Sequence, residues 1–143
     1  FTPLREVLSG KRVLLVEDHP VNRRVVELIL EDVADVECAE NGVLGLTAFC
    51  AQAFDVVLMD MQMPVMDGLE ATRAIRSHEC KSKTARTPIV MLSANALPEH
   101  VLAGRDAGAD FHLAKPITAD DLMNALARAL QLYPDAKEIA QAS

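Results

Sequence analysis

Residues 55–60, Asp55-Val56-Val57-Leu58-Met59-Asp60, are an unbroken apolar run with an acid at each end. A short apolar run without polar alternation is typical of a strand that is buried on both faces, as in a parallel sheet covered by helices. The run therefore predicts a central strand over 55–59 that ends at Asp60. A solvated strand end explains this acid poorly, because the strand before it is predicted to be buried.

The same kind of pattern recurs along the chain, with helical patterns between the apolar runs. Further strands are predicted at Val13–Val16, Asp35–Ala39, Pro88–Leu92 and Asp110–Ala114. Helices are predicted from Pro20 (with Val21, Val25, Leu28 and Ile29 at helical spacing), over Leu44–Ala53, Leu69–Arg76 and Pro98–Gly108, and around Leu122–Leu130, stopped by Pro134. The polar stretch Ser77–Thr87 is predicted to be the least structured internal segment. Five strand–helix units predict an α/β, flavodoxin-like doubly wound (βα)5 fold, with helices on both faces of a five-stranded parallel sheet of order 2-1-3-4-5.

Composition excludes several classes of function. The 143 residues fit one domain, and 50% hydrophobic residues exclude wholesale disorder. A net charge of −7 and only 3% aromatic residues argue against nucleic-acid binding. No apolar run approaches the roughly 20 residues of a membrane span, and no secretory signal opens the chain. Direct membrane insertion is therefore not expected.

The three cysteines, Cys38, Cys50 and Cys80, are scattered and show no metal-ligand spacing. Zinc binding and cysteine catalysis are therefore not expected. Free thiols fit a reducing compartment, and we expect a cytoplasmic location.

Polar residues follow four of the predicted strands: Glu17-Asp18, Asp60, Ser93 and Lys115. Ligands of open α/β sheets bind beyond the carboxyl ends of the strands, so these side chains are expected at one edge. Crowded carboxylates repel one another, and a hard divalent cation such as Mg²⁺ relieves that repulsion. A carboxylate beside a cation can attack a phosphoryl group and form an aspartyl phosphate, with a lysine neutralising the transferred charge and a hydroxyl donating to it. Each residue taken alone also has an ordinary structural explanation; the combination favours this chemistry.

These residues lie in motifs that resemble the receiver domains of two-component signalling, the CheY-like response-regulator family. The motifs are Leu14–Asp18, Met59–Gly68, Leu92–Ala94 and Lys115-Pro116, and the resemblance covers about residues 11–132. It implies that Asp60 is the phosphoacceptor and that Asp18, Asp60 and the backbone carbonyl of Gln62 bind Mg²⁺, for which Mn²⁺ can substitute. Glu17 would assist the metal through a water. Lys115 would pair with the phosphoryl group, and Ser93 would be the switch hydroxyl.

Val16–Asn22, the methionine-rich stretch after Asp60 and Ala94–Leu97 resemble more narrowly the receivers of hybrid sensor histidine kinases. This implies a linker end at 1–10, a receiver domain at 11–133 and a C-terminal tail at 134–143. The implied partners are the phosphohistidine domain of a histidine kinase and a histidine phosphotransfer domain. The receiver would catalyse its own phosphorylation and dephosphorylation within the cytoplasmic part of a sensor kinase; a stand-alone response regulator is the alternative.

Two histidines depart from the family pattern. His19 stands where this subgroup usually has asparagine, and His112 stands where many receivers carry a switching tyrosine or phenylalanine. Imidazole is smaller than those rings and titrates near a pKa of about 6.5. The coupling between Ser93 and residue 112 is therefore expected to differ from that of the family.

Two other classes of function compete with a phosphorylation switch. A phosphatase of the haloacid-dehalogenase kind would carry a second acid two residues after the nucleophile, where this chain has Gln62. An inert interaction module would have lost an acid or the lysine, and this chain keeps them all. Nucleotide binding is not expected, because the sequence has no glycine-rich phosphate-binding loop. Gly10-Lys11 does not lie within the G-x-x-x-x-G-K-S/T pattern.

Overall fold

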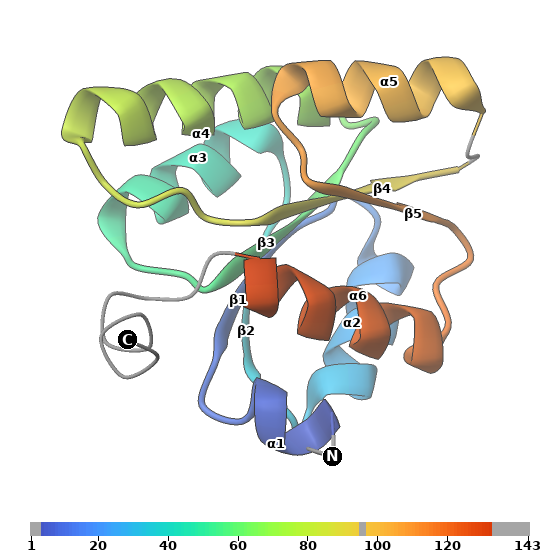
Figure 1. Ribbon diagram of the computed structural model, residues 1–143. Coiled ribbons are helices and arrows are strands. Elements are labelled where there is room, and N and C mark those ends of the chain that lie inside the picture. The colour runs from blue at the N-terminus through green and yellow to red at the C-terminus, as the bar shows by residue number, and fades with distance from the viewer. Residues whose placement is uncertain (1–3, 95–96, 133–143) are drawn as a thin grey trace.

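The computed structural model describes residues 4–94 and 97–132 and forms a parallel sheet between two layers of helices (Figure 1). The strands are β1 (Arg12–Val16), β2 (Asp35–Ala39), β3 (Val56–Asp60), β4 (Ile89–Ser93) and β5 (Phe111–Ala114). The helices are α1 (Leu4–Leu8), α2 (Pro20–Leu30), α3 (Gly42–Ala51), α4 (Gly68–Ser82), α5 (Pro98–Ala107) and α6 (Ala119–Leu132). The strand order is β2-β1-β3-β4-β5, and every neighbouring pair is parallel. The predicted fold class and strand order are confirmed.

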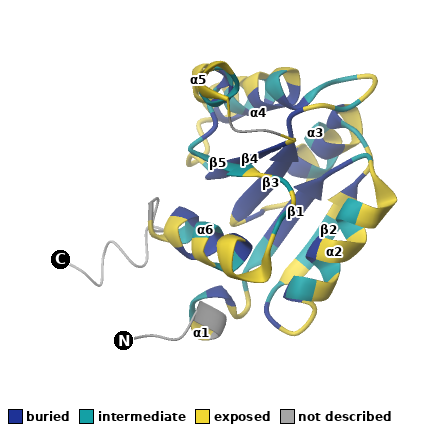
Figure 2. Ribbon diagram, turned by 90° about the vertical axis from the view of Figure 1, so that its right-hand side faces the viewer, coloured by how far each residue is buried: buried dark blue, intermediate teal, exposed yellow. Residues whose placement is uncertain are grey.

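The sheet separates two hydrophobic cores, because successive strand residues point to opposite faces. Val13 and Leu15 of β1 belong to the core beneath α1, α2 and α6, whereas Leu14 and Val16 belong to the core beneath α3 and α4. All five residues of β3 are buried, and Figure 2 shows the middle strands as the buried centre of the molecule. Burial on both faces explains why the sequence of this strand is apolar without alternation.

Of the four apolar residues whose spacing predicted helix α2, Ile29 packs partly against the core, and the other three are exposed. Val26 and Leu30 are buried, whereas Val21, Val25 and Leu28 are 62%, 39% and 52% exposed. The helix is therefore apolar on two sides, and only one of them is covered by the sheet.

Helix α4 extends to Ser82, so the prediction that order is lowest from Ser77 onward was wrong for its first six residues. The reason is a set of contacts made by Arg76 and Glu79. Arg76 donates to Glu79 at 2.8 Å, and the Glu79 carboxylate accepts the backbone N–H of Thr87 at 2.6 Å. Buried Glu79 thus ties the last turns of the helix to the start of the next strand.

The sequence did not predict helix α1, which lies within the segment expected to be a linker end. Leu8 is fully buried in the core that also contains Leu122 and Leu126 of α6. Pro134 and the tail at 134–143 lie outside the described residues. The domain boundaries remain predictions.

The three cysteines are exposed and free. None of the helices in the described part of the chain combines the length and hydropathy that a bilayer crossing requires.

Arg76 also connects α4 to the turn before β5. Its guanidinium donates to Asp110 at 2.9 Å, to the carbonyl of Thr87 at 2.7 Å and to that of Gly108 at 3.0 Å. The Glu79 and Asp110 side chains are each only 6% exposed, so both carboxylates depend on this cation. Arg86 supports Asp110 from the solvent side at 3.1 Å.

We expect Arg76→Ala to lower the free energy of unfolding by about 3 kcal/mol. The substitution removes several hydrogen bonds and leaves a buried carboxylate without its cation. Urea denaturation followed by circular dichroism measures the change. Arg73→Ala, an exposed position on the same helix, is the matched control and should stay within about 0.5 kcal/mol of the parent. Equal effects of the two variants would show that the Arg76 contacts contribute nothing to stability.

Candidate functional site

The polar residues singled out in the sequence lie together at the carboxyl edge of the sheet. Strand register brings this about: Val16 of β1 pairs with Met59 of β3, and Asp60 pairs with Leu92 of β4. Glu17 and Asp18 therefore leave β1 beside the end of β3. On the other side, Ser93 pairs with Ala114, which places Lys115 one residue beyond the end of β5.

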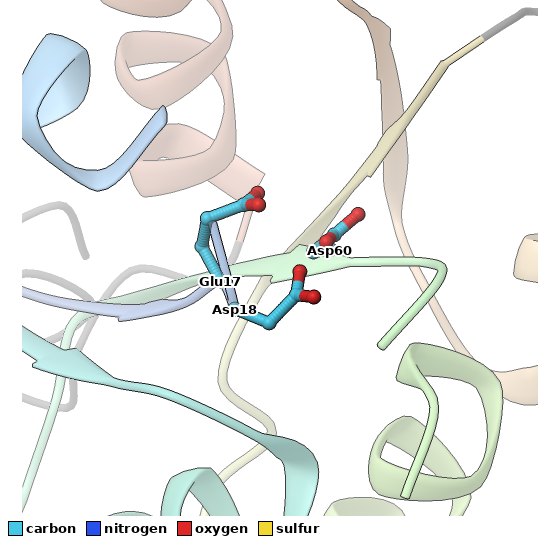
Figure 3. A group of neighbouring side chains, drawn as sticks. All are labelled: Glu17, Asp18 and Asp60. Carbon is cyan, nitrogen blue, oxygen red and sulfur yellow. The ribbon is translucent and has the colours of Figure 1, made fainter. Parts of the chain in front are cut away.

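Three carboxylates form the centre of the site. One oxygen each from Glu17, Asp18 and Asp60 can be chosen so that all lie within 4.8 Å of one another. Figure 3 shows the three side chains gathered where β1 and β3 end. Glu17 and Asp60 are 1% and 3% exposed, whereas Asp18 is half-buried and gives the cluster a side open to solvent.

Lys115 is the cation that faces these acids. Its Nζ lies 3.1 Å from Asp60 Oδ1 and 3.1 Å from Glu17 Oε2. Burial and the charge of Glu17 raise the pKa of Asp60 to about 7, although Lys115 opposes the shift. Burial alone would lower the pKa of Lys115, but the Glu17 and Asp60 carboxylates outweigh it, and the pKa is raised. The ammonium is therefore charged at neutral pH, and it is outnumbered by the acids.

The acidic cluster fits a hard divalent cation. Carboxylate oxygens are the donors that Mg²⁺ prefers, and it commonly binds through one or two of them while keeping several waters. Two buried acids provide oxygen ligands in fixed positions, and half-buried Asp18 leaves room for solvent ligands. The negative charge of Glu17 adds to the effect of burial in raising the pKa of Asp60.

The start of α2 holds the acidic loop in place through residues that sequence reasoning did not assign. Asn22 Nδ2 and the backbone N–H of His19 donate to Glu17 Oε1 at 3.3 and 3.2 Å. Arg23 Nη1 donates to the backbone carbonyls of Glu17 and Asp18 at 2.8 and 3.0 Å. The sequence did contain a signal for these contacts. Pro20 begins a helix directly after Glu17 and Asp18, so the first turn of that helix has to lie beside the two acids. His19 caps this helix, because its Nδ1 accepts from the N–H of Val21 at 3.3 Å.

The loop after Asp60 packs against the strand end so closely that only glycine fits at position 68. A Cβ built on Gly68 would lie 2.1 Å from the backbone oxygen of Asp60 and 2.8 Å from Cα of Met61. Gly68 N–H donates to the carbonyl of Met61 at 3.0 Å. The exposed residue Gln62 donates its N–H to Asp60 Oδ1 at 3.4 Å. This loop therefore fixes the position of the Asp60 carboxylate from its own side of the sheet.

Ser93 and His112 form the other half of the site. Ser93 is 3% exposed, and its Oγ makes a hydrogen-bonding contact with His112 Nε2. The sequence placed both residues near the site, and the structure adds their direct contact. Asn95 and Ala96, part of the motif that resembles hybrid-kinase receivers, lie outside the described residues.

Comparisons with known proteins match this chain to one protein family. The family model described as "response regulator receiver domain" matches residues 13–127. The sensor protein GacS of Pseudomonas syringae pv. syringae is 43% identical over 112 residues, which are 78% of this chain and 12% of that protein. The chain thus spans about an eighth of that relative.

Two solved structures are similar in fold. The receiver domain of sensor histidine kinase PA1611 from Pseudomonas aeruginosa PAO1, with magnesium in its active-site cleft, has a TM-score of 0.77 and 37% identity, covering 86% of this chain and 99% of that one. The Ssk1 receiver domain of Saccharomyces cerevisiae, crystallised with the histidine phosphotransfer protein Ypd1, has a TM-score of 0.82 and 24% identity, covering 89% and 94%.

The family match covers most of the chain, and the fold and strand order agree with it. This chain therefore belongs to the response regulator receiver domain family of two-component signalling.

Proposed function

We propose that Asp60 accepts a phosphoryl group from a phosphohistidine. The observation that supports this most directly is the arrangement of a buried carboxylate at the end of β3 with two further acids and an ammonium around it. In the step, an Oδ atom of Asp60 attacks phosphorus, and a P–O bond forms. The P–N bond to the histidine breaks, its electron pair stays on the imidazole nitrogen, and an acyl phosphate results.

Asp18, Asp60 and the backbone carbonyl of Gln62 would hold Mg²⁺, with Glu17 assisting through a water; Mn²⁺ would substitute. When bound, the ion would supply positive charge to the carboxylates and to the phosphoryl oxygens. The support is the fit of the acidic cluster, together with the magnesium described for the similar PA1611 receiver.

Lys115 and Ser93 would bind the phosphoryl group from the β4–β5 side. Lys115 Nζ already lies 3.1 Å from Asp60 Oδ1, so it can move onto a phosphoryl oxygen with little displacement. The Ser93 hydroxyl can donate to a second oxygen, and His112 stands where it can follow the movement of Ser93. Phosphorylation would in this way be converted into a change of conformation at the ends of β4 and β5.

The donor or recipient of the phosphoryl group would be a helical phosphohistidine domain, of a histidine kinase or of a histidine phosphotransfer protein. The apolar stripe on α2, formed by Val21, Val25 and Leu28, is exposed and begins three residues after Asp18. A helix with an uncovered apolar stripe packs well against another helix. Docking there would bring a histidine on the partner toward Asp60, and the Ssk1–Ypd1 structure shows a receiver of the same fold bound to such a protein.

We place the chain within a hybrid sensor histidine kinase that works in the cytoplasm. The support is its identity with a segment of the sensor protein GacS and the presence of three free cysteines, which suits a reducing compartment.

Asp60→Asn should abolish covalent phosphorylation by acetyl phosphate in the presence of Mg²⁺, because the amide is not a competent nucleophile. Incorporation of acid-labile, hydroxylamine-sensitive ³²P measures it. Asp106→Asn, an exposed position on α5, is the control and should label like the parent. Undiminished labelling of the Asp60 variant would place the acceptor elsewhere.

Val25→Asp should slow phosphoryl transfer from a phosphorylated histidine phosphotransfer protein at least about tenfold, because it places a charge in the docking stripe. Phosphorylation by acetyl phosphate should not change, since the small donor needs no docking surface. Leu102→Asp on α5, also at an exposed apolar position, is the matched control. An equal loss of transfer rate in both variants would show that α2 is not the specific docking face.

A further inference from the structure

Strand register explains why His112 reaches Ser93. His112 of β5 pairs with Met91 of β4, and Ser93 lies two residues beyond Met91 on the same face. The imidazole therefore extends toward the end of β4, where its Nε2 contacts Ser93 Oγ. The contact lies on the face of the sheet that α5 covers, beside a cavity of about 30 Å³ lined by Val101, Gly104 and His112.

A serine hydroxyl has one proton to donate. A neutral imidazole nitrogen can accept that proton, whereas a phenylalanine ring at the same position offers no such acceptor. When the imidazole is protonated, Nε2–H becomes a donor and Ser93 Oγ must accept from it. The hydroxyl proton is then available to another acceptor.

We propose that His112 is a positioning residue that controls the Ser93 hydroxyl: neutral His112 accepts its proton and holds it back, and protonated His112 releases it to the phosphoryl group. The inference rests on the proposed function, because the competing acceptor is a phosphoryl oxygen on Asp60. It assigns the resting imidazole proton to Nδ1, because only an unprotonated Nε2 can accept the Ser93 proton.

Charged groups around His112 set the direction of the coupling. Arg105 of α5 lines the same cavity and opposes protonation. Asp110, at the start of β5, is bound by Arg76 and Arg86, so its charge is already balanced. A phosphoryl group on Asp60 adds negative charge near the end of β4 and favours the imidazolium.

Two further cations, from the end of β5 and from α6, already have other partners. Lys115, after β5, is paired with Glu17 and Asp60. On α6, Arg128 stacks over Phe111, whose side chain points to the opposite face of the sheet. Since imidazole titrates near pH 6.5, mild acidification should favour the phosphorylated arrangement of Ser93.

The first test compares affinities for beryllofluoride, a phosphoryl analogue, at saturating Mg²⁺ and at about pH 6 and about pH 8. His112→Phe should bind the analogue about 2–10-fold more tightly than the parent at the higher pH, the size expected from removing one competing hydrogen bond. The ratio should fall toward one at the lower pH. His112→Gln keeps an acceptor but does not titrate. At both pH values it should therefore bind the analogue more weakly than His112→Phe, by the same factor as the parent does at the higher pH. His78→Gln is the matched control and should follow the parent.

The second test uses the histidine ring itself. Binding and protonation are reciprocal, so beryllofluoride should raise the pH midpoint of the His112 ring resonances. In Ser93→Ala this rise should be smaller. The variant has no hydroxyl to exchange between His112 and the phosphoryl analogue, so only the negative charge of the analogue still favours the imidazolium. Ring ¹⁵N shifts report whether the resting proton is on Nδ1.

The outcomes separate the two proposals. A parent-to-His112→Phe ratio that does not depend on pH, an unchanged rise in Ser93→Ala, or a resting proton on Nε2 would overturn the role of His112 while phosphorylation of Asp60 stands. Failure of beryllofluoride to bind the parent and every variant would overturn the proposed function and the role of His112 with it.

Discussion

The repulsion between three carboxylates at the end of one sheet governs the design of this domain. Two of these acids are buried, and in a low-dielectric site each resists the charge of the others. Burial, and after it the charge of Glu17, raises the pKa of Asp60 even with an ammonium at 3.1 Å. If the cluster had no function, replacing one of its acids would relieve the repulsion and stabilise the fold. The cluster is therefore best understood as a site that binds positive charge.

The surrounding structure holds the acids together against that repulsion. Arg23 binds the backbone of the acidic loop, and Asn22 binds Glu17 directly. On the other side, Gly68 lets the following loop lie against the backbone of Asp60. The contacts from α2 hold the end of β1, and the contact at the start of α4 holds the end of β3, so both layers of helices help to build the site. The cost of assembling the site is thus spread over the fold.

The sequence could predict the sheet and the residues at its edge because both depend on local pattern. Apolar runs mark the buried strands, and parallel strands all end at the same edge, so Asp60, Ser93 and Lys115 had to lie near one another. The length of α4 could not be predicted in this way, since its last turns depend on Arg76 and Glu79 reaching Thr87 and Asp110. Burial of Leu8 likewise depends on α6, more than a hundred residues further along the chain.

Helix α2 shows a different limit of prediction from sequence. When a helix has two apolar faces, spacing alone does not tell which face is buried against the sheet. Val26 and Leu30 fit the sheet, while Val21, Val25 and Leu28 stay in water. Exposing them has a cost, of the order of 1 kcal/mol or more for each fully uncovered side chain, which a purely structural helix would avoid. The same helix supplies Asn22 and Arg23 to the acidic loop, so a partner that covers the stripe also contacts the element that holds Glu17 and Asp18 in place. Under the proposed docking, a partner seated on α2 would therefore contact the same helix that holds the acids in place.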